Sequence, residues 1–482
     1  MSGWRPGGPP RGLWVGFGFG GFGQIVSGEA PEACAPSPAW LRPRGAGGHP
    51  PELRRLSPAW SSTGGLTVDG QLVLSGFLGG CPQQYVQLPS HGCLDILAAE
   101  KYLLLMFNNC VECYDTDALR SGRSLEDPVW KMDLPAETGK AFPLVADGHV
   151  MPKPPFFRTL PCDIKAQKLS LGTEHALLLS STWEVFTWGS GRHGQLGHGG
   201  LEDVSEPLVV EGLRGISMSD VAAGSWHSVS ISESGDIYTW GWNESGQLGL
   251  PSKRLAEESK GASSCTSKEA GQGNGNLGEK PAKETKNSPT PDKGNLGEKP
   301  AKETTNPSTL EEDNLVEKPA KKTTNPSTPE EGNLGEKPKK ETNNPSTPED
   351  CNLGGSSEGI DTLEKDGDPV SDFISIQAFP ALLDLPEESE VLRVSCGSRH
   401  TSAVTRDGCL YTWGWGAYGQ LGHSDANSLD QPRLVEYFLE KQLFVKDVVC
   451  GLWNTFVLCI PKANSLDRQL DFGTRDIPTS LS

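Results

Sequence analysis

The chain has 482 residues with a formal net charge of −19 at pH 7, and 35% of its residues are hydrophobic. An acidic chain is poorly suited to non-specific binding of nucleic-acid phosphates, which requires clustered Lys and Arg. The sequence contains no run of 18 apolar residues, so we expect no membrane-spanning helix.

Residues 13–165 contain weak copies of a repeating unit. Residues 14–24, WVGFGFGGFGQ, resemble the second half of the unit, and further degenerate copies lie near residues 58 and 99. In the copy near residue 58, Ser61 occupies the position at which later copies carry histidine. A further unit between residues 100 and 165 is possible. Residues 147–158, DGHVMPKPPFFR, form a Pro-rich loop.

Residues 166–250 contain two regular copies, and a third follows in residues 373–462. Each has Gly, then His three residues later, an apolar run, Thr-Trp-Gly and Gly-Gln-Leu-Gly, and the step from Gly172 to Gly224 is 52 residues. Alternation of Val229 and Ile231 with serines predicts a half-buried strand. Self-similar units of about 50 residues with Gly and aromatic signatures are typical of β-propeller blades.

A different repeat fills residues 251–372. Asn-Leu recurs with a period of 19 residues, among many Pro and charged residues and few large apolar ones. Such a composition cannot bury enough apolar area to offset chain entropy, so we expect a disordered insert in the loop that leaves one blade. Its Ser-Pro and Thr-Pro pairs are candidate phosphorylation sites, and a tandem expansion without a role is the alternative.

The final unit, residues 448–459, resembles only the first half of a repeat. The chain ends therefore complement each other, and we expect them to share one blade, closing the ring. The predicted fold is an all-β propeller of six to seven blades: a first part at 1–250 (degenerate at 13–165, regular at 166–250), the insert, a last part at 373–462 and a tail at 463–482. We expect a monomer.

Three histidines occupy one position of the repeat, His175, His227 and His400. Because they belong to different blades, we predict a structural role in which each ring donates to a neighbouring backbone carbonyl, rather than a metal or catalytic site. His193 and His198 lie in Gly-rich turns and are expected to be exposed. Cys110 and Cys113 form a C-x-x-C pair without a second ligand pair, so we expect free thiols. The predicted structural repeat residues are Gly172, His175, Trp188, Gly189, Gly224, His227, Trp240, Gly241, Gly397, His400, Trp413, Gly414 and Gly451.

The segments GSGRHGQLG, GWNESGQLG and GWGAYGQLG make the repeats similar to those of the regulator of chromosome condensation family. The resemblance implies a β-propeller. The family's founding member is a guanine nucleotide exchange factor for a small nuclear GTPase and binds the nucleosome, which gives one hypothesis for this chain. An adaptor for a ubiquitin ligase or the cytoskeleton is another.

A closer resemblance within the family, carried by VGFGFGGFGQ, AFPALLDLP and CGLWNTFV, implies a non-enzymatic protein of the nucleus. It implies a chromosome-associated partner of a JmjC-domain oxygenase that influences histone methylation and chromosome segregation. Histones are possible further partners, some of the protein could be cytoplasmic, and no cofactor, metal or sequence-specific nucleic acid is expected. A hydroxylated arginine is implied near residues 146–158, where Asp147 aligns with it and Arg158 is the arginine present. The predicted partner-binding residues are Asp147, His149, Lys153, Phe156, Phe157 and Arg158.

Overall fold

The computed structural model describes residues 12–25, 34–41, 52–89, 92–117, 127–135, 141–257 and 373–462. Residues 258–372 of the insert predicted at 251–372, and the predicted tail at 463–482, lie outside these residues. Within them, no helix is long and apolar enough to cross a membrane.

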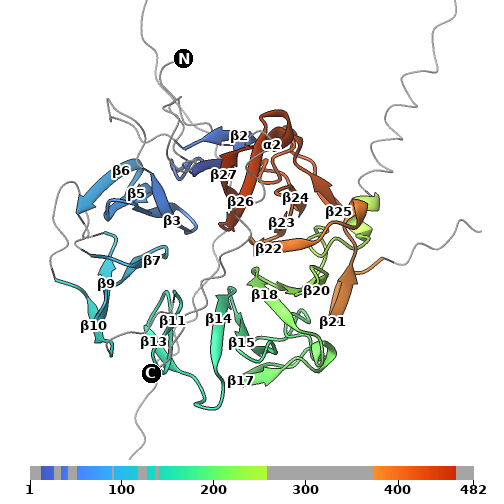
Figure 1. Ribbon diagram of the computed structural model, residues 1–482, viewed down its shortest axis with the longest axis horizontal. Helices are drawn as coiled ribbons and strands as arrows, with labels where there is room; N and C mark the ends of the chain where they lie inside the picture. The colour runs from blue at the N-terminus through green and yellow to red at the C-terminus, as the bar shows by residue number, and fades with distance from the viewer. Residues whose placement is uncertain are drawn as a thin grey trace, which may run out of the picture. The chain divides into compact units, whose positions relative to one another are not determined.

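Seven antiparallel sheets, blades A to G, surround a central axis (Figure 1). The strands of the first four blades are β26 (Leu443–Cys450), β27 (Asn454–Pro461), β1 (Leu13–Phe19) and β2 (Cys34–Trp40) in A; β3 (Leu53–Pro58), β4 (Ser62–Thr67), β5 (Gln71–Leu78) and β6 (Cys81–Pro89) in B; β7 (Asp95–Ala98), β8 (Tyr102–Met106), β9 (Cys110–Asp115) and β10 (Trp130–Asp133) in C; and β11 (Leu144–Val145), β12 (Gly148–Val150) and β13 (Phe157–Thr159) in D.

The remaining three blades hold the regular repeats. Their strands are β14 (Ala166–Leu171), β15 (His175–Ser180), β16 (Val185–Gly189) and β17 (Val204–Val209) in E; β18 (Met218–Ala223), β19 (His227–Ser232), β20 (Ile237–Trp242) and β21 (Ile376–Leu383) in F; and β22 (Val391–Cys396), β23 (His400–Thr405), β24 (Leu410–Gly414) and β25 (Leu429–Leu434) in G. Short helices η1 (Glu211–Leu213), η2 (Pro386–Glu388) and α2 (Glu436–Glu440) lie in connections.

Blade A confirms the predicted closure. β1 pairs antiparallel with β27, with Leu13 opposite Cys459 and Gly18 opposite Asn454. The two ends of the chain therefore complete one sheet, which leaves no unpaired edge between the first and last blades. The seventh blade is D, in the interval where the sequence allowed a further unit, and the described residues give it three strands.

The insert interrupts a blade rather than a connection between blades. β20 pairs with β21 across it, with Trp242 opposite Ile376. The prediction that the insert lies in the loop leaving a blade is therefore wrong, because the outer strand of blade F follows the insert in sequence.

The core lies between neighbouring blades. Val229 and Ile231 of β19 are fully buried, and so are the intervening serines, because both faces of the strand are covered. Ser228 Oγ donates to the carbonyl of Gln195 (2.7 Å), and Ser230 Oγ to that of Asp220 (3.0 Å). The predicted half-buried strand is thus buried on both faces, and its hydroxyls meet their hydrogen-bonding needs inside the protein.

Candidate interaction surfaces

Blade D carries the segment that the sequence analysis selected for partner binding. Asp147 forms the turn between β11 and β12 with a φ of 59°, and Gly148 follows because a Cβ there would lie 2.2 Å from the Arg158 carbonyl oxygen. Asp147, Lys153 and Arg158 are exposed. These three charged residues remain available to a partner.

Of the other three selected residues, His149 is buried and Phe156 and Phe157 are partly buried. His149 is 2% exposed and lies edge-on to Trp188 of blade E, with ring centroids 6.0 Å apart. Burial and the nearby charge of Arg158 lower the pKa of His149 to about 4, so its ring is neutral at pH 7. Phe156 contacts Tyr102 and Trp130 of blade C at centroid distances of 4.9 and 5.6 Å.

Phe157 is partly buried and packs against the same apolar cluster as Phe156. His149, Phe156 and Phe157 therefore join blade D to its neighbours, and the candidate contact surface shrinks to the three charged residues.

The repeat histidines connect consecutive blades. Nε2 of His175 lies 2.9 Å from Ser228 Oγ, Nε2 of His227 lies 2.9 Å from Thr401 Oγ1, and Nε2 of His400 lies 3.0 Å from Thr455 Oγ1. Each of these hydroxyl groups donates its single proton to a backbone carbonyl. The hydroxyl oxygen must therefore accept a hydrogen bond from Nε2–H of the histidine ring. The predicted backbone-carbonyl partner is therefore wrong: the ring reaches that carbonyl through a hydroxyl of the next blade.

Burial keeps these rings neutral. It lowers the pKa of His175, His227 and His400 to about 3. The preceding glycines provide the space: a Cβ on Gly224 would lie 2.2 Å from the His227 ring and 2.7 Å from the Gly397 carbonyl oxygen. The Gly and His of the repeat motif thus form one structural unit.

The remaining structural repeat residues also lie in the blades. Trp240 and Trp413 are fully buried, and their indole Nε1 atoms donate to the carbonyls of Gln195 (2.9 Å) and Gln247 (3.0 Å), while Trp188 is 8% exposed. Gly189, Gly241 and Gly414 have φ values of 113°, 110° and 103°, in the region that favours glycine.

Two minor predictions have different outcomes. His198 is partly buried, with Nε2 3.0 Å from Thr187 Oγ1, and His193 is partly buried between Trp226 and Trp242, so the expectation that both are exposed is wrong. Cys110 and Cys113 are buried free thiols. The described residues contain no group of three or more His, Cys, Asp or Glu side chains arranged to hold a metal ion.

The innermost strands place charged side chains that the sequence analysis did not select. Asp95 of β7 is buried and pairs with Arg55 of β3, with Arg55 Nε 3.2 Å from Oδ1. The same carboxylate accepts hydrogen bonds from the backbone N–H groups of Ile96 (2.9 Å) and Phe142 (2.9 Å). Phe142 lies just before β11, so Asp95 connects blades B, C and D. We call this arrangement an aspartate bridge.

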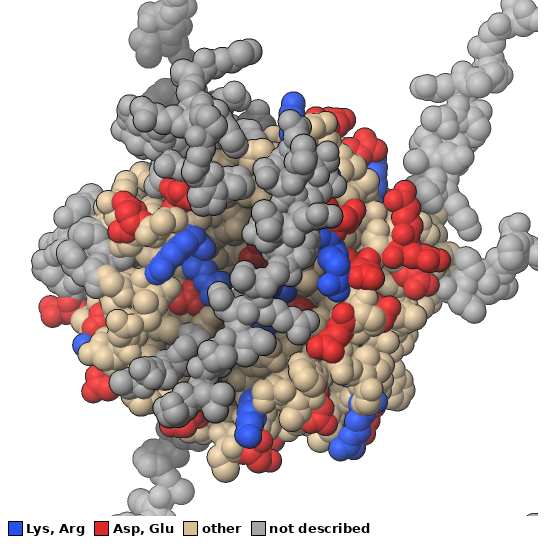
Figure 2. Space-filling view, viewed as in Figure 1, with Lys and Arg blue, Asp and Glu red and all other residues tan. Residues whose placement is uncertain are grey.

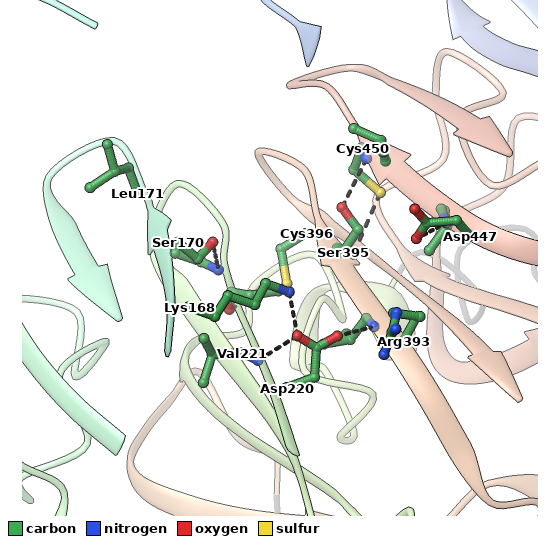
Figure 3. A pocket seen from close by; sticks show the side chains of 15 residues that line it. Lys168, Ser170, Leu171, Asp220, Val221, Arg393, Ser395, Cys396, Asp447 and Cys450 are labelled. Atoms are coloured by element: carbon green, nitrogen blue, oxygen red, sulfur yellow. Dashed lines mark hydrogen bonds and ion pairs between the residues drawn. The ribbon is translucent and has the colours of Figure 1, made fainter. Parts of the chain in front are cut away.

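A second aspartate bridge connects blades E, F and G. Asp220 of β18 is 2% exposed and pairs with Lys168 of β14. It also accepts from the N–H groups of Val221 (3.0 Å) and Val394 (3.4 Å). Both bridges use a base from the preceding blade, an aspartate, and an amide from the following blade. Figure 3 shows Lys168 reaching Asp220.

Arg393 of β22 and Asp447 of β26 hold the corresponding positions in blades G and A. Asp447 accepts from its own following amide, Val448 N–H (2.9 Å), as the other two aspartates do, but forms no ion pair with a described residue. Burial raises the pKa of Asp447, and the charges of Arg393 and Lys168 lower it in part. Arg393 and Asp447 therefore occupy the positions of an aspartate bridge but do not form its ion pair (Figure 3).

A cavity of about 310 Å³ is bounded by β14, β18, β22 and β26. The charged side chains that line it are Lys168, Asp220, Arg393 and Asp447. On the face in Figure 2, basic side chains are interspersed with acidic ones, and the visible described residues form no continuous basic patch. This agrees with the acidic net charge, because a phosphate backbone is bound by clustered Lys and Arg and none is seen among the described residues of this face.

The bridges escaped sequence analysis although a signal was present. Arg55, Lys168, Asp220, Arg393 and Asp447 each follow a register shift in the innermost strand of their blade. A charged residue at one position of six of the seven aligned repeats, with alternating sign, is the pattern that would have revealed them.

Comparisons with known proteins agree with the repeats seen in the structure. Models of the regulator of chromosome condensation (RCC1) repeat match residues 184–231, 234–262 and 407–458, and a second model of this repeat matches 218–247 and 391–420. These matches cover blades E to G, and two of them extend further, one into the insert and one into blade A.

Similarity to two relatives extends over almost the whole chain. The chain is 39% identical to human RCC1 domain-containing protein 1 over 94% of its own length and 98% of that protein, and 36% identical to the mouse protein over 94% and 99%. Among solved structures, Prp20p from Saccharomyces cerevisiae, studied with its binding to Gsp1p and histones, has a TM-score of 0.55 at 13% identity. That alignment covers 94% of this chain and 93% of Prp20p, and it supports the fold alone.

Proposed function

This chain belongs to the regulator of chromosome condensation repeat family, and we propose that it is a non-enzymatic interaction scaffold in the nucleus that binds a JmjC-domain oxygenase on chromatin. Through this partner it would influence histone methylation and chromosome segregation. The observation that supports the proposal is the similarity to human RCC1 domain-containing protein 1 over nearly the full length of both chains.

The structure suggests where such a partner would bind. Blade D exposes Asp147, Lys153 and Arg158 on a scaffold fixed by His149 and Phe156. Exposed charges on a rigidly supported loop favour specific binding, because little order must be gained when the partner docks. We therefore place the oxygenase contact at these three residues.

The test is direct binding between the purified full-length chain and the purified catalytic domain of a JmjC-domain oxygenase. We expect binding that weakens about tenfold in Lys153→Glu and Arg158→Glu, since charge reversal at a contact costs on the order of 1–2 kcal/mol. Arg214→Glu is the matched control, because Arg214 is also exposed but directly follows η1 in another blade and pairs with Glu211.

A nucleotide-release assay on a small nuclear GTPase, run beside the binding assay, measures the alternative of an exchange factor. Accelerated release without oxygenase binding would overturn the scaffold proposal. Oxygenase binding that is unchanged in both blade D variants would leave the scaffold standing and remove blade D as its contact.

A further inference from the structure

Blade F presents two tryptophans at its rim. Trp226 precedes the repeat histidine and Trp242 ends β20, and their rings meet edge-to-face with centroids 5.4 Å apart. His193 of blade E lies 6.1 and 5.7 Å from these rings. All three side chains are partly buried, so each keeps a surface that a ligand can reach.

Arg399 of blade G extends over this pair. Its guanidinium carbon lies 4.6 Å from the centroid of Trp242 and 5.8 Å from that of Trp226. The backbone is fixed where the side chain begins, because the Arg399 carbonyl accepts from Trp415 N–H at 2.7 Å. Stacking on indole holds the guanidinium in one plane and leaves its N–H edge free to bind.

Among the described residues, no carboxylate forms an ion pair with Arg399. Its Nε–H is buried without a hydrogen-bond partner in the described part of the chain, and no acidic side chain there lies within ion-pair distance. Five other described arginines each pair with an acidic residue: Arg55, Arg192, Arg214, Arg406 and Arg433. Arg399 is distinct from these five in being partly buried and unpaired.

The surroundings of Arg399 disfavour an isolated cation. Burial, followed by the charge of Arg254, lowers its pKa, while the charge of Glu244 acts in the opposite direction without forming an ion pair. The guanidinium nevertheless stays protonated at pH 7. A partly desolvated cation with an unused donor gains more from an incoming carboxylate than an exposed one does.

Aromatic side chains continue from this point across blades G, A and B. Trp415 contacts Tyr418 and Trp453 at 4.9 and 5.0 Å, and Tyr418 contacts Phe19 at 5.1 Å. Phe22 then contacts Phe19, Trp60 and Phe77, and the last two are 37% exposed. A partly exposed aromatic row next to an arginine has the composition of a protein-binding hot spot.

We propose that Arg399, with Trp226 and Trp242, binds an acidic segment of a partner protein that also carries apolar side chains. A carboxylate of that segment accepts from the terminal N–H groups of the Arg399 guanidinium, because Nε is itself buried. The apolar side chains beside it pack on the aromatic row that begins at Trp415. The site uses blades F and G, and its existence does not depend on the oxygenase contact proposed for blade D.

The probe is a short labelled peptide of alternating Glu and Phe, compared with a counterpart in which Gln replaces every Glu. Fluorescence anisotropy with the full-length protein should show binding at least about tenfold tighter for the Glu peptide, the factor expected for a charge-assisted hydrogen bond. Arg399→Met retains the stacking length and removes the charge, so it should abolish this preference. Arg433→Met, which removes an exposed arginine elsewhere in blade G, should leave the preference intact.

Arg399→Lys is a second variant that keeps the proposal testable if Arg399→Met does not fold. It keeps the charge without the planar donor edge, so it should bind the Glu peptide with intermediate affinity. Equal affinity of the wild-type protein for the Glu and Gln peptides would overturn the proposal. So would a preference that survives in a folded Arg399→Met protein.

Discussion

The ion pair between Lys168 and Asp220 is expected to stabilise the ring through three blades at once. The side chain of Asp220 is 3% exposed and that of Lys168 is 43% exposed. Replacing Lys168 by Met keeps the aliphatic stem and leaves the carboxylate buried without its cation. Replacing Asp220 by Asn keeps the shape and frees an ammonium group that can return to water.

The different exposed fractions of the two side chains predict that the two substitutions lower the unfolding free energy by different amounts. Removing one partner of a buried pair costs about 3–5 kcal/mol. Lys168→Met should lower the unfolding free energy by about 3 kcal/mol, the low end of this range, because two backbone N–H groups still bind the Asp220 carboxylate. Asp220→Asn should cost about 1–2 kcal/mol, because Lys168 regains hydration but an amide is poorly matched to the surrounding donors. The double variant should then show a coupling energy of about 1–2 kcal/mol.

Chemical denaturation of the four proteins, with unfolding free energies compared at equal m values, measures this coupling. The matched control is the pair of Arg433 and Asp425, whose atoms are 3.5 Å apart and whose side chains are 50% and 34% exposed. Its cycle should give no more than about 0.5–1 kcal/mol. A coupling between Lys168 and Asp220 no larger than that of the control would refute the three-blade role of Asp220.

Three further predictions concern the repeat itself. The repeat histidines have pKa values of about 3 in the folded protein, against an ordinary value of 6.5. The unfolded chain therefore binds more protons than the folded protein between these two pH values, and stability falls as pH drops below about 6.5. His227→Asn should reduce this dependence of the unfolding free energy on pH, measured by denaturation at several pH values, by about 1.4 kcal/mol per pH unit. Gly241→Ala should cost more than about 2 kcal/mol, because φ is 110° and the new Cβ would lie 2.6 Å from the Trp226 carbonyl oxygen, whereas Gly70→Ala, with φ of 80° and nothing within 4 Å, should cost about 1 kcal/mol; equal losses would contradict the steric argument. Phe17→Ala removes a fully buried ring from the closing blade and should cost about 3–5 kcal/mol in the same assay, while a loss below about 1 kcal/mol would show that the termini contribute little to stability.

Sequence patterns predicted the features of the fold that repeat along the chain. The Gly-His spacing, the Thr-Trp-Gly strand and the complementary half-units at the ends identified blades and their closure, because each depends on residues close in sequence. In blade B the prediction was displaced by one residue. Ala59 N–H donates to the Ser62 carbonyl as Gly224 N–H does to that of His227, so Ser62, not Ser61, holds the histidine position.

Contacts between blades could not be predicted from patterns of residues close in sequence. Asp220 and Val394 are far apart in the chain, and no local pattern shows that the amide of one blade meets the carboxylate of another. Phe156 and His149 looked like loop residues because Pro residues surround them, yet neighbouring blades bury them. For Arg399 the sequence shows only that an arginine replaces the tryptophan of the preceding copy, and the missing carboxylate is a fact of three-dimensional structure.

The number of blades explains why the innermost charges can alternate around a closed ring. Taken in ring order from blade A, the charges belong to Asp447, Arg55, Asp95, Lys168, Asp220 and Arg393, with one blade omitted. Strict alternation cannot close in a ring of seven. Blade D resolves this, because its innermost strand β11 consists only of Leu144 and Val145, and six charges of alternating sign remain.

This alternation predicts the effect of reversing one charge. Arg393→Glu would place a carboxylate between Asp220 and Asp447, whereas Arg393→Gln only removes the cation. We expect the Glu variant to be less stable than the Gln variant by about 1 kcal/mol, the scale of two charges a few ångströms apart in a partly solvated channel, and the difference to shrink as salt is added. Equal stability of the two variants at low salt would mean that the charges act only within the separate aspartate bridges and that their order around the ring carries no energy.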